Sequence, residues 1–460
     1  MIAKLIKIKY VLNDSRRIDG RHYLNNDALL SSVMVENEDK CLPLSECALA
    51  FNPPVFKRQF CQDTEKAVQY FQSSDVPSAK ERSNVFINKA QAKRINASVK
   101  ENQILITGFG TIGNVRLASR LQEGVAYANN VCRVEVKENH KYGFIYAFLA
   151  SRYGRAQMNK NASGSVVRYI ESPGIRKILI PAFTDEKQQQ IHLLIKQSAE
   201  MRVEANRLLE EAEKRFLDRL RIGLSANKKF QVASKNIIQL ATSFQKRIDA
   251  PAFLNKGIQI IKQLKENDFE FISLKECKVS VSRPGIFKRI YVKVDGFPYI
   301  KGSELELTNP FNNCVYLSKK KTPFLNELTF CQNQILITCA GSVGNVRIIT
   351  KEFEDLKAIG SQDIIRIECQ DNDLFSNEYI FAYLRLPFVF DFIQSLKYGS
   401  VIERIEPFHV DQIPVLIPTK DFSERITKII QKYKENIYNA FIKENQAIQL
   451  IEKEIEQWQQ

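Results

Sequence analysis

Three short patterns in this sequence resemble chemical sites known from other proteins. Gly108-x-Gly110-x-x-Gly113 follows a β-branched run, as the glycine fingerprint of a dinucleotide-binding site does. Asn52-Pro-Pro-Val55 is similar to the Asn-Pro-Pro-aromatic loop with which adenine methyltransferases hold a flipped base, but the aromatic residue is missing. Glu135-Val-Lys137 is similar to the end of a nuclease Glu-x-Lys motif. Each pattern would imply a different enzyme.

A long-range repeat tests these patterns. Residues 102–116 read NQILITGFGTIGNVR and residues 333–347 read NQILITCAGSVGNVR, so eleven of the fifteen positions are identical. The second copy has Cys339 in place of the first glycine and keeps neither the Asn-Pro-Pro loop nor the Glu-x-Lys pattern. The four histidines are dispersed without metal-ligand spacing. The sequence therefore predicts a non-catalytic protein with no cofactor and no metal ion.

The repeat continues on both sides of this hairpin. Leu44-Ser-Glu-Cys47 pairs with Leu274-Lys-Glu-Cys277, and Ile178-Leu-Ile-Pro181 pairs with Val415-Leu-Ile-Pro418. Each Ile-Pro segment is followed by a charged, helix-like stretch. We infer two tandem copies of one unit, each long enough to bury its own core.

Composition favours a polyanionic partner. The 460 residues carry a formal net charge of +15, which points to nucleic acid first and to an anionic membrane second, although a merely soluble basic protein remains an alternative. The N-terminus has no signal-peptide core, and no run of 18 apolar residues exists, so we expect no membrane span. Nine cysteines without Cys-x-x-Cys spacing indicate reduced thiols and a cytoplasmic location.

The pattern of apolar, charged and turn residues divides the chain into α/β (mixed α+β) globular regions and long helices. The globular regions alternate short β-branched runs with turn residues and include helical stretches such as 141–158. The predicted parts are a first globular domain at 1–183, a central helix at 184–222, a connector at 223–245, a second globular domain at 246–419 and a C-terminal helix at 420–460.

Both long helices carry an apolar stripe with a few polar misfits. Ser198 and Arg202 interrupt the stripe of the central helix, and Glu444 and Glu454 interrupt that of the C-terminal helix. We expect the two stripes to pair as an antiparallel coiled coil. The alternative is that each helix packs only on its own domain.

Small-residue turns near arginines are the predicted DNA contacts. A Gly-x-x-Gly turn lets backbone amides and a hydroxyl approach a phosphate, and an arginine beyond it could reach a phosphate or a guanine edge. An ordinary tight hairpin with a solvated arginine is the alternative. The candidates in the first copy are Thr107, Gly110, Thr111, Gly113, Asn114, Arg116, Ser73, Ser74, Ser165 and Arg168. Those in the second copy are Thr338, Gly341, Ser342, Gly344, Asn345, Arg347, Lys301, Ser303, Ser400 and Arg404.

The order of these motifs resembles that of the specificity subunit of type I restriction–modification enzymes. The resemblance covers nearly the whole chain, although the family's Pro-x-x-Glu-Gln helix start has drifted at Pro181 and further at Pro418. It implies two target recognition domains, spacer helices that dock two methyltransferase (modification) subunits, and restriction/translocase subunits that join through the complex. It also implies double-stranded DNA as the ligand.

Antiparallel helices would give tandem domains opposite senses on the duplex. The expected target is therefore bipartite and asymmetric, with half-sites about 34 Å apart, within the reach of a helix of about 54 Å. A stand-alone sequence-specific DNA-binding protein is the first alternative. A DNA adenine methyltransferase with built-in specificity is the second, against which the missing cofactor loop argues.

Overall fold

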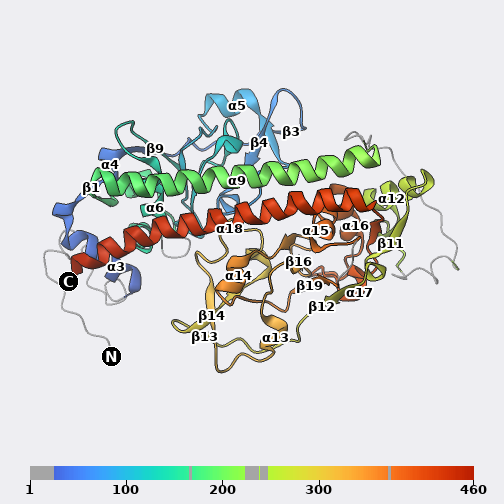
Figure 1. Cartoon of the computed structure of the whole chain (residues 1–460). Coiled ribbons are helices and arrows are strands. Elements are labelled where there is room, and N and C mark those ends of the chain that lie inside the picture. The colour runs from blue at the N-terminus through green and yellow to red at the C-terminus, as the bar shows by residue number, and fades with distance from the viewer. Residues whose placement is uncertain (1–24, 165–167, 223–237, 239–246, 371–373, 460) are drawn as a thin grey trace. The chain divides into compact units, whose positions relative to one another are not determined.

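The computed structural model divides the chain into two compact units. Unit 1 comprises residues 1–203 and 439–460, and unit 2 comprises residues 204–438. The structure describes residues 25–164, 168–222, 238, 247–370 and 374–459 (Figure 1). Ser165, the start of the first predicted domain and the predicted connector at 223–245, apart from Ile238, lie outside the described residues.

Unit 1 is a mixed α/β domain. Its strands are β1 (Cys41–Pro43), β2 (Ala48–Phe51), β3 (Phe60–Cys61), β4 (Ala67–Phe71), β5 (Phe86–Asn88), β6 (Ile104–Thr107), β7 (Val115–Leu117), β8 (Ala126–Tyr127), β9 (Val131–Val136) and β10 (Leu179–Pro181). Its α-helices are α3 (Asn26–Glu36), α4 (Leu44–Cys47), α5 (Lys89–Arg94), α6 (Tyr142–Ala150), α7 (Arg152–Lys160) and α8 (Ser172–Arg176). Short 3-10 turns are η1 (Glu38–Lys40), η2 (Ser73–Asp75), η3 (Arg120–Gln122) and η6 (Gln457–Gln459).

Unit 2 repeats this order of elements. Its strands are β11 (Phe271–Ser273), β12 (Val279–Ser282), β13 (Tyr291–Val292), β14 (Gly296–Ile300), β15 (Val315–Ser318), β16 (Ile335–Thr338), β17 (Val346–Ile348), β18 (Ile359–Gly360), β19 (Ile364–Cys369) and β20 (Pro414–Leu416). Its α-helices are α11 (Pro251–Leu254), α12 (Lys256–Glu266), α13 (Leu325–Leu328), α14 (Lys351–Asp355), α15 (Asn377–Leu384), α16 (Pro387–Ser395) and α17 (Pro407–Val410). Its 3-10 turns are η4 (Leu274–Cys277) and η5 (Gly302–Glu304).

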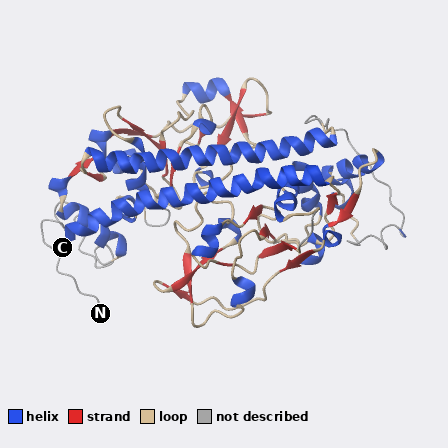
Figure 2. Ribbon diagram, in the orientation of Figure 1, coloured by secondary structure: helices blue, strands red, loops and turns tan. Residues whose placement is uncertain are grey.

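The two units share one sheet topology, and each combines strands with helices (Figure 2). The main antiparallel sheet has the order β2-β9-β6-β7 in unit 1 and β12-β19-β16-β17 in unit 2. A second sheet has the order β3-β5-β4-β8 or β13-β15-β14-β18, with its last pair parallel. A two-stranded pair, β1-β10 or β11-β20, precedes each long helix. The tandem duplication predicted from the repeat is confirmed at the level of strand order.

The central strand of each main sheet is buried on both faces. In β6, Ile104 and Ile106 belong to the large core beneath α6, whereas Leu105 belongs to a separate small cluster on the opposite face. In β16, Ile335 and Ile337 alternate with Leu336 in the same way. Because successive side chains of a strand point to opposite faces, this short apolar run holds two cores together.

The predicted long helices are α9 (Asp185–Leu220) and α18 (Lys420–Glu456). Thr184 caps α9, since its hydroxyl accepts the Lys187 N–H at 3.5 Å, and acidic residues fill the first turn. The helical stretch predicted at 141–158 is two helices, because Ser151 adopts an extended conformation and its hydroxyl caps α7. Among the described residues, no helix has the length and apolarity needed to cross a membrane.

In unit 1, the N-terminal half of α9 pairs with the C-terminal half of α18 in antiparallel orientation (Figure 1). The polar residues that interrupt the two apolar stripes bond across the helix pair. Ser198 donates to the Ala440 carbonyl at 2.7 Å, and Arg202 pairs with Glu444, which also accepts the Tyr146 hydroxyl. Because Glu444 is only 2% exposed, these partners are what make its burial tolerable.

In unit 2, the other halves of the same two helices pair through apolar residues. Phe216 of α9 packs edge-on against Phe422 of α18 with ring centroids 5.2 Å apart, and it also contacts Tyr379 and Tyr383 of α15. Leu208, Ala212 and Leu220 of α9 lie in the same core cluster as Ile426 and Ile430 of α18. The predicted antiparallel pairing of the two helices is therefore confirmed within each unit.

Candidate nucleic-acid interface

The repeated Gly-x-x-Gly turn joins β6 to β7 and β16 to β17, and a buried threonine closes it. The Thr107 hydroxyl donates to the Thr111 carbonyl at 2.6 Å and accepts the Asn114 N–H at 3.0 Å. Thr338 makes the same two contacts, with the Ser342 carbonyl and with the Asn345 N–H at 3.0 Å. Each threonine is almost completely buried, so we assign these two predicted DNA contacts to the architecture of the turn.

The two glycines of each turn need left-handed backbone. Gly110 and Gly113 have φ of 75° and 82°, and Gly341 and Gly344 have φ of 72° and 94°. The first glycine of each pair lies at the exposed tip beside Thr111 or Ser342, whereas the second is buried. Thr111 and Ser342 are exposed, and a contact with a phosphate stays a prediction for both.

The arginine that follows each turn points inward, where the sequence predicted a contact with DNA. Arg116 contacts both carboxylate oxygens of Glu81 at 2.7 Å and donates to the Ser78 carbonyl at 2.5 Å. Burial acts to lower the pKa of Arg116, but Glu81 and Tyr127 raise it above its ordinary value. These contacts occupy the guanidinium, so Arg116 is a residue that positions the segment after η2.

Arg347 plays the same part in unit 2 without a carboxylate partner. Its guanidinium donates to the carbonyls of Leu305 and Leu307 at 2.8 and 2.9 Å and lies over the Phe353 ring at 5.0 Å. Burial lowers the pKa of Arg347. In both units the arginine links the hairpin to the segment that follows the small-residue turn η2 or η5. The arginine therefore occurs in both copies because it makes this contact within each unit.

The structure brings the predicted loops of unit 2 together at one end of β16. The Gly341 N–H at the turn donates to the Glu403 carbonyl at 3.3 Å, which joins the turn to the Gly-Ser loop that contains Ser400. A side chain added at Gly302 would meet the Thr338 methyl at 3.6 Å, so η5 lies beside the same turn. Ser303 and Lys301 next to Gly302 are exposed, and Lys301 forms an ion pair with Glu304 at 3.5 Å.

Unit 1 joins its turn to its Gly-Ser loop in the same manner. The Ile170 N–H donates to the Gly108 carbonyl at 2.8 Å, and Phe109 forms an isolated β-bridge with Tyr169. Arg168 is exposed and donates to the Asn159 carbonyl. Ser74 of η2 is exposed, whereas the Ser73 hydroxyl is buried.

Isolated β-bridges hold the base of the Gly-Ser loop in both units. Tyr169 bridges both Phe109 and Ser163, and Arg404 bridges both Ala340 and Tyr398. Arg404 is therefore the structural counterpart of Tyr169. The sequence analysis gave no weight to the aromatic pair Phe109 and Tyr169, which stack at 5.4 Å and are both more than a third exposed.

The three patterns that resemble enzyme motifs have structural roles in unit 1. A side chain at Gly108 would lie 2.7 Å from the Ile170 carbonyl oxygen, and the turn leads into strand β7, where a dinucleotide site needs a helix. The Asn52 side chain bonds the Ser172 N–H and the Asn129 carbonyl, both at 3.0 Å. Glu135 pairs with Lys100 at 3.0 Å.

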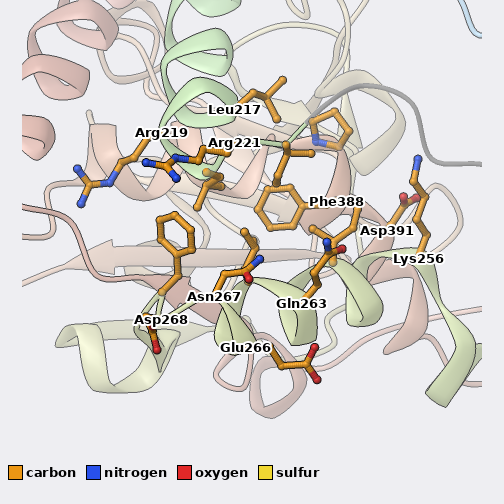
Figure 3. A pocket seen from close by; sticks show the side chains of 16 residues that line it. Leu217, Arg219, Arg221, Lys256, Gln263, Glu266, Asn267, Asp268, Phe388 and Asp391 are labelled. Carbon is orange, nitrogen blue, oxygen red and sulfur yellow. The ribbon is translucent and has the colours of Figure 1, made fainter.

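A cavity of about 980 Å³ lies elsewhere in unit 2, at the C-terminal end of α9 (Figure 3). Lysine and arginine side chains line it together with Glu266, Asp268 and Asp391, and Figure 3 shows Arg219 and Glu266 directed away from its centre. No group of three metal-ligating side chains occurs among the described residues. The cavity lining has no convergent set of polar groups that would define a ligand.

Comparison with known proteins identifies the family of this chain. The model of the type I restriction modification DNA specificity domain matches residues 52–213 and 266–450, one segment for each repeat. The chain belongs to this family. A comparison with curated proteins found no match.

Solved structures with similarity to this chain include specificity subunits. The type I restriction–modification S subunit from M. genitalium is 14% identical with a TM-score of 0.37, covering 89% of this chain and 95% of that chain. The HsdS subunit from Thermoanaerobacter tengcongensis is 13% identical with a TM-score of 0.27, covering 91% and 95%. The type IIG restriction endonuclease BpuSI is 10% identical with a TM-score of 0.30, covering 41% and 30%.

As a specificity-domain protein, the chain has a role in DNA recognition. Its second sheet adds exposed residues that the sequence analysis missed. Phe60 in unit 1 and Tyr291 in unit 2 are more than half exposed, and three consecutive lysines, Lys319 to Lys321, follow β15. In unit 2, Tyr291 on β13 pairs with Leu317 on β15, so the exposed aromatic side chain is on the strand next to the one that the lysines follow. Aromatic and basic side chains together are a common composition for nucleic-acid surfaces. Of these residues, the run of three lysines is the feature that the sequence alone could have indicated.

Proposed function

We propose that this chain is the DNA sequence-recognition subunit of a type I restriction–modification complex. Each unit reads one half of a bipartite, asymmetric DNA target, and the long helices dock methyltransferase subunits, two per chain, through which restriction subunits join. The chain itself contributes recognition and no catalysis.

One observation carries this proposal: the two units share a scaffold but differ at its exposed surface. The turn with its buried threonine, the inward arginine and the bridge to the Gly-Ser loop occur in both units. Within that frame, Phe109 and Tyr169 of unit 1 are replaced by Ala340 and Arg404 of unit 2. A duplicated frame with different surface chemistry is what reading two different half-sites requires.

The helices support the docking part of the proposal. Most of their outward-facing residues are polar, but Leu193 of α9 and Ile442 of α18 are each more than 40% exposed within unit 1. Neighbouring Gln197 and Lys443 are joined by a 2.8 Å hydrogen bond between the two helices, so this outer face is well defined. Exposed apolar residues on an ordered helical face suit a protein partner.

Selection of DNA from a random duplex library by the full chain, alone and with its methyltransferase subunits, tests this function. We expect two short, different sequence blocks separated by a gap of fixed length. A single contiguous block or a palindrome would contradict the two-unit reading. In a parallel experiment, replacing Leu193 and Ile442 by glutamate should weaken co-purification of the methyltransferase and leave DNA binding by the chain intact.

A further inference from the structure

The Gly-Ser loop of unit 2 is a short, closed loop whose base is fixed by hydrogen bonds. Tyr398 and Arg404 exchange backbone hydrogen bonds of 3.0 and 2.9 Å across its base. On the next residue, the Ile405 N–H donates to the Cys339 carbonyl at 2.9 Å, which binds the loop to the Gly-x-x-Gly turn. The backbone that carries Arg404 is therefore held from two sides.

The groups around Arg404 are already engaged with other partners. The Glu403 carboxylate forms an ion pair with Lys397. Glu406 forms an ion pair with Arg283 at 3.2 Å and accepts the Tyr398 hydroxyl at 2.9 Å. Both carboxylates that flank Arg404 in sequence thus have cationic partners of their own.

The Arg404 side chain itself projects into solvent. It is exposed, and within the described part of the chain its guanidinium makes no hydrogen bond or ion pair. This contrasts with Arg116 and Arg347, whose guanidinium groups are bonded inside their units. An arginine on a fixed backbone, with its donors uncommitted, is preorganised for a ligand that takes two parallel hydrogen bonds.

We propose that Arg404 is a specificity-determining residue of unit 2 that reads a guanine in one half-site. Guanine presents O6 and N7 together in the major groove, and the guanidinium fork matches this pair of acceptors. The inference rests on the proposed function and adds to it the identity of one recognised base and of the residue that reads it.

The equivalent place in unit 1 has no such fork. Phe109 and Tyr169 stack there with an interplanar angle of 14°, and they present ring surface and one hydroxyl. Ala340 leaves more room beside Arg404 than Phe109 leaves beside Tyr169. The arginine contact to guanine therefore belongs to one half-site only, and it contributes directly to the asymmetry of the target.

Replacement of Arg404 tests this inference in the full chain. Base preference is measured by selection from a random duplex library and by titration of matched duplexes that differ at one position. Arg404→Ala should abolish preference for one guanine, lowering discrimination by about 5- to 150-fold, the range of a bidentate contact. Arg425→Ala is the matched control, because Arg425 is an exposed arginine on α18 that pairs with Asp421 at 2.9 Å.

A transplant gives a second, independent result. The double substitution Phe109→Ala and Tyr169→Arg gives unit 1 the pair found in unit 2, and it should create a guanine preference in the other half-site. If Arg404→Ala weakens all duplexes equally and reduces the salt dependence by about one ion, Arg404 contacts a phosphate and the inference is wrong. Unchanged discrimination also overturns it.

The outcomes separate this inference from the proposed function. If the wild-type chain selects a bipartite target and Arg404→Ala keeps the guanine preference, only the assignment of Arg404 fails. If the wild-type chain selects no bipartite target, either alone or with methyltransferase subunits, the proposed function fails and the inference fails with it.

Discussion

Replacing Arg116 by methionine tests whether this arginine supports the fold or contacts DNA. The change removes the two 2.7 Å contacts with Glu81 and leaves a carboxylate whose side chain is only 15% exposed without its cation. Loss of one partner of a buried ion pair costs about 3–5 kcal/mol, because the remaining charge is desolvated and unpaired. We expect the lower half of this range, since the remaining exposure of Glu81 admits some water.

Urea unfolding followed by tryptophan fluorescence measures this cost in unit 1. Trp458 is the only tryptophan of the chain, and it packs against Phe183 of the same unit with ring centroids 6.1 Å apart. The matched control is the double substitution Arg116→Met and Glu81→Met, which replaces the pair by apolar side chains and should recover most of the lost stability.

The reasoning would be refuted by a stable Arg116→Met variant with weaker DNA binding. If the urea midpoint stays unchanged while the salt dependence of DNA binding falls by about one ion, Arg116 contacts a phosphate. Arg347→Met gives an internal comparison in unit 2. It leaves two backbone carbonyls without a charged donor and should cost less, about 2 kcal/mol, as followed by circular dichroism.

Three further predictions concern single side chains. Burial lowers the pKa of His192, so on acidification the unfolded chain binds a proton at His192 before the folded chain does. The contribution of His192 to the free energy of unfolding should be constant above about pH 6.5 and fall below it. His192→Asn should make the urea midpoint less dependent on pH in that range. Gly344→Ala should lower the free energy of unfolding by at least about 2 kcal/mol, because φ at Gly344 is 94° and the new methyl group would lie 2.9 Å from the Gln394 side chain. Gly341→Asn should be nearly neutral. Thermal unfolding measures both variants, and equal losses of stability would contradict this reasoning. Glu444→Leu should cost about 3–5 kcal/mol in urea unfolding and Glu444→Leu with Arg202→Leu much less, and additive losses would show that the two residues do not act as a pair.

The sequence alone was sufficient to predict the architecture, because comparison of its two copies separates structural motifs from chance patterns. Any pattern that must serve a shared scaffold recurs at the same place in both copies, whereas accidental patterns such as Asn52-Pro-Pro-Val55 do not. Helical periodicity then located α9 and α18 within a few residues of their ends. Periodicity also marked Arg202 and Glu444 as misfits, though it did not show that the two are partners.

Tertiary structure decided which recurring residues face inward. Spacing along the chain cannot distinguish an arginine that reaches for a phosphate from one that reaches for a carbonyl, because both need the same side chain one step beyond the turn. The partners of Arg116 and Arg347 lie 35 to 42 residues away in sequence, in segments that differ between the copies. The same limit applies to the neighbours of Arg404. Its bridge to Ala340 joins two loops that are distant in the sequence, and local sequence similarity does not predict that contact.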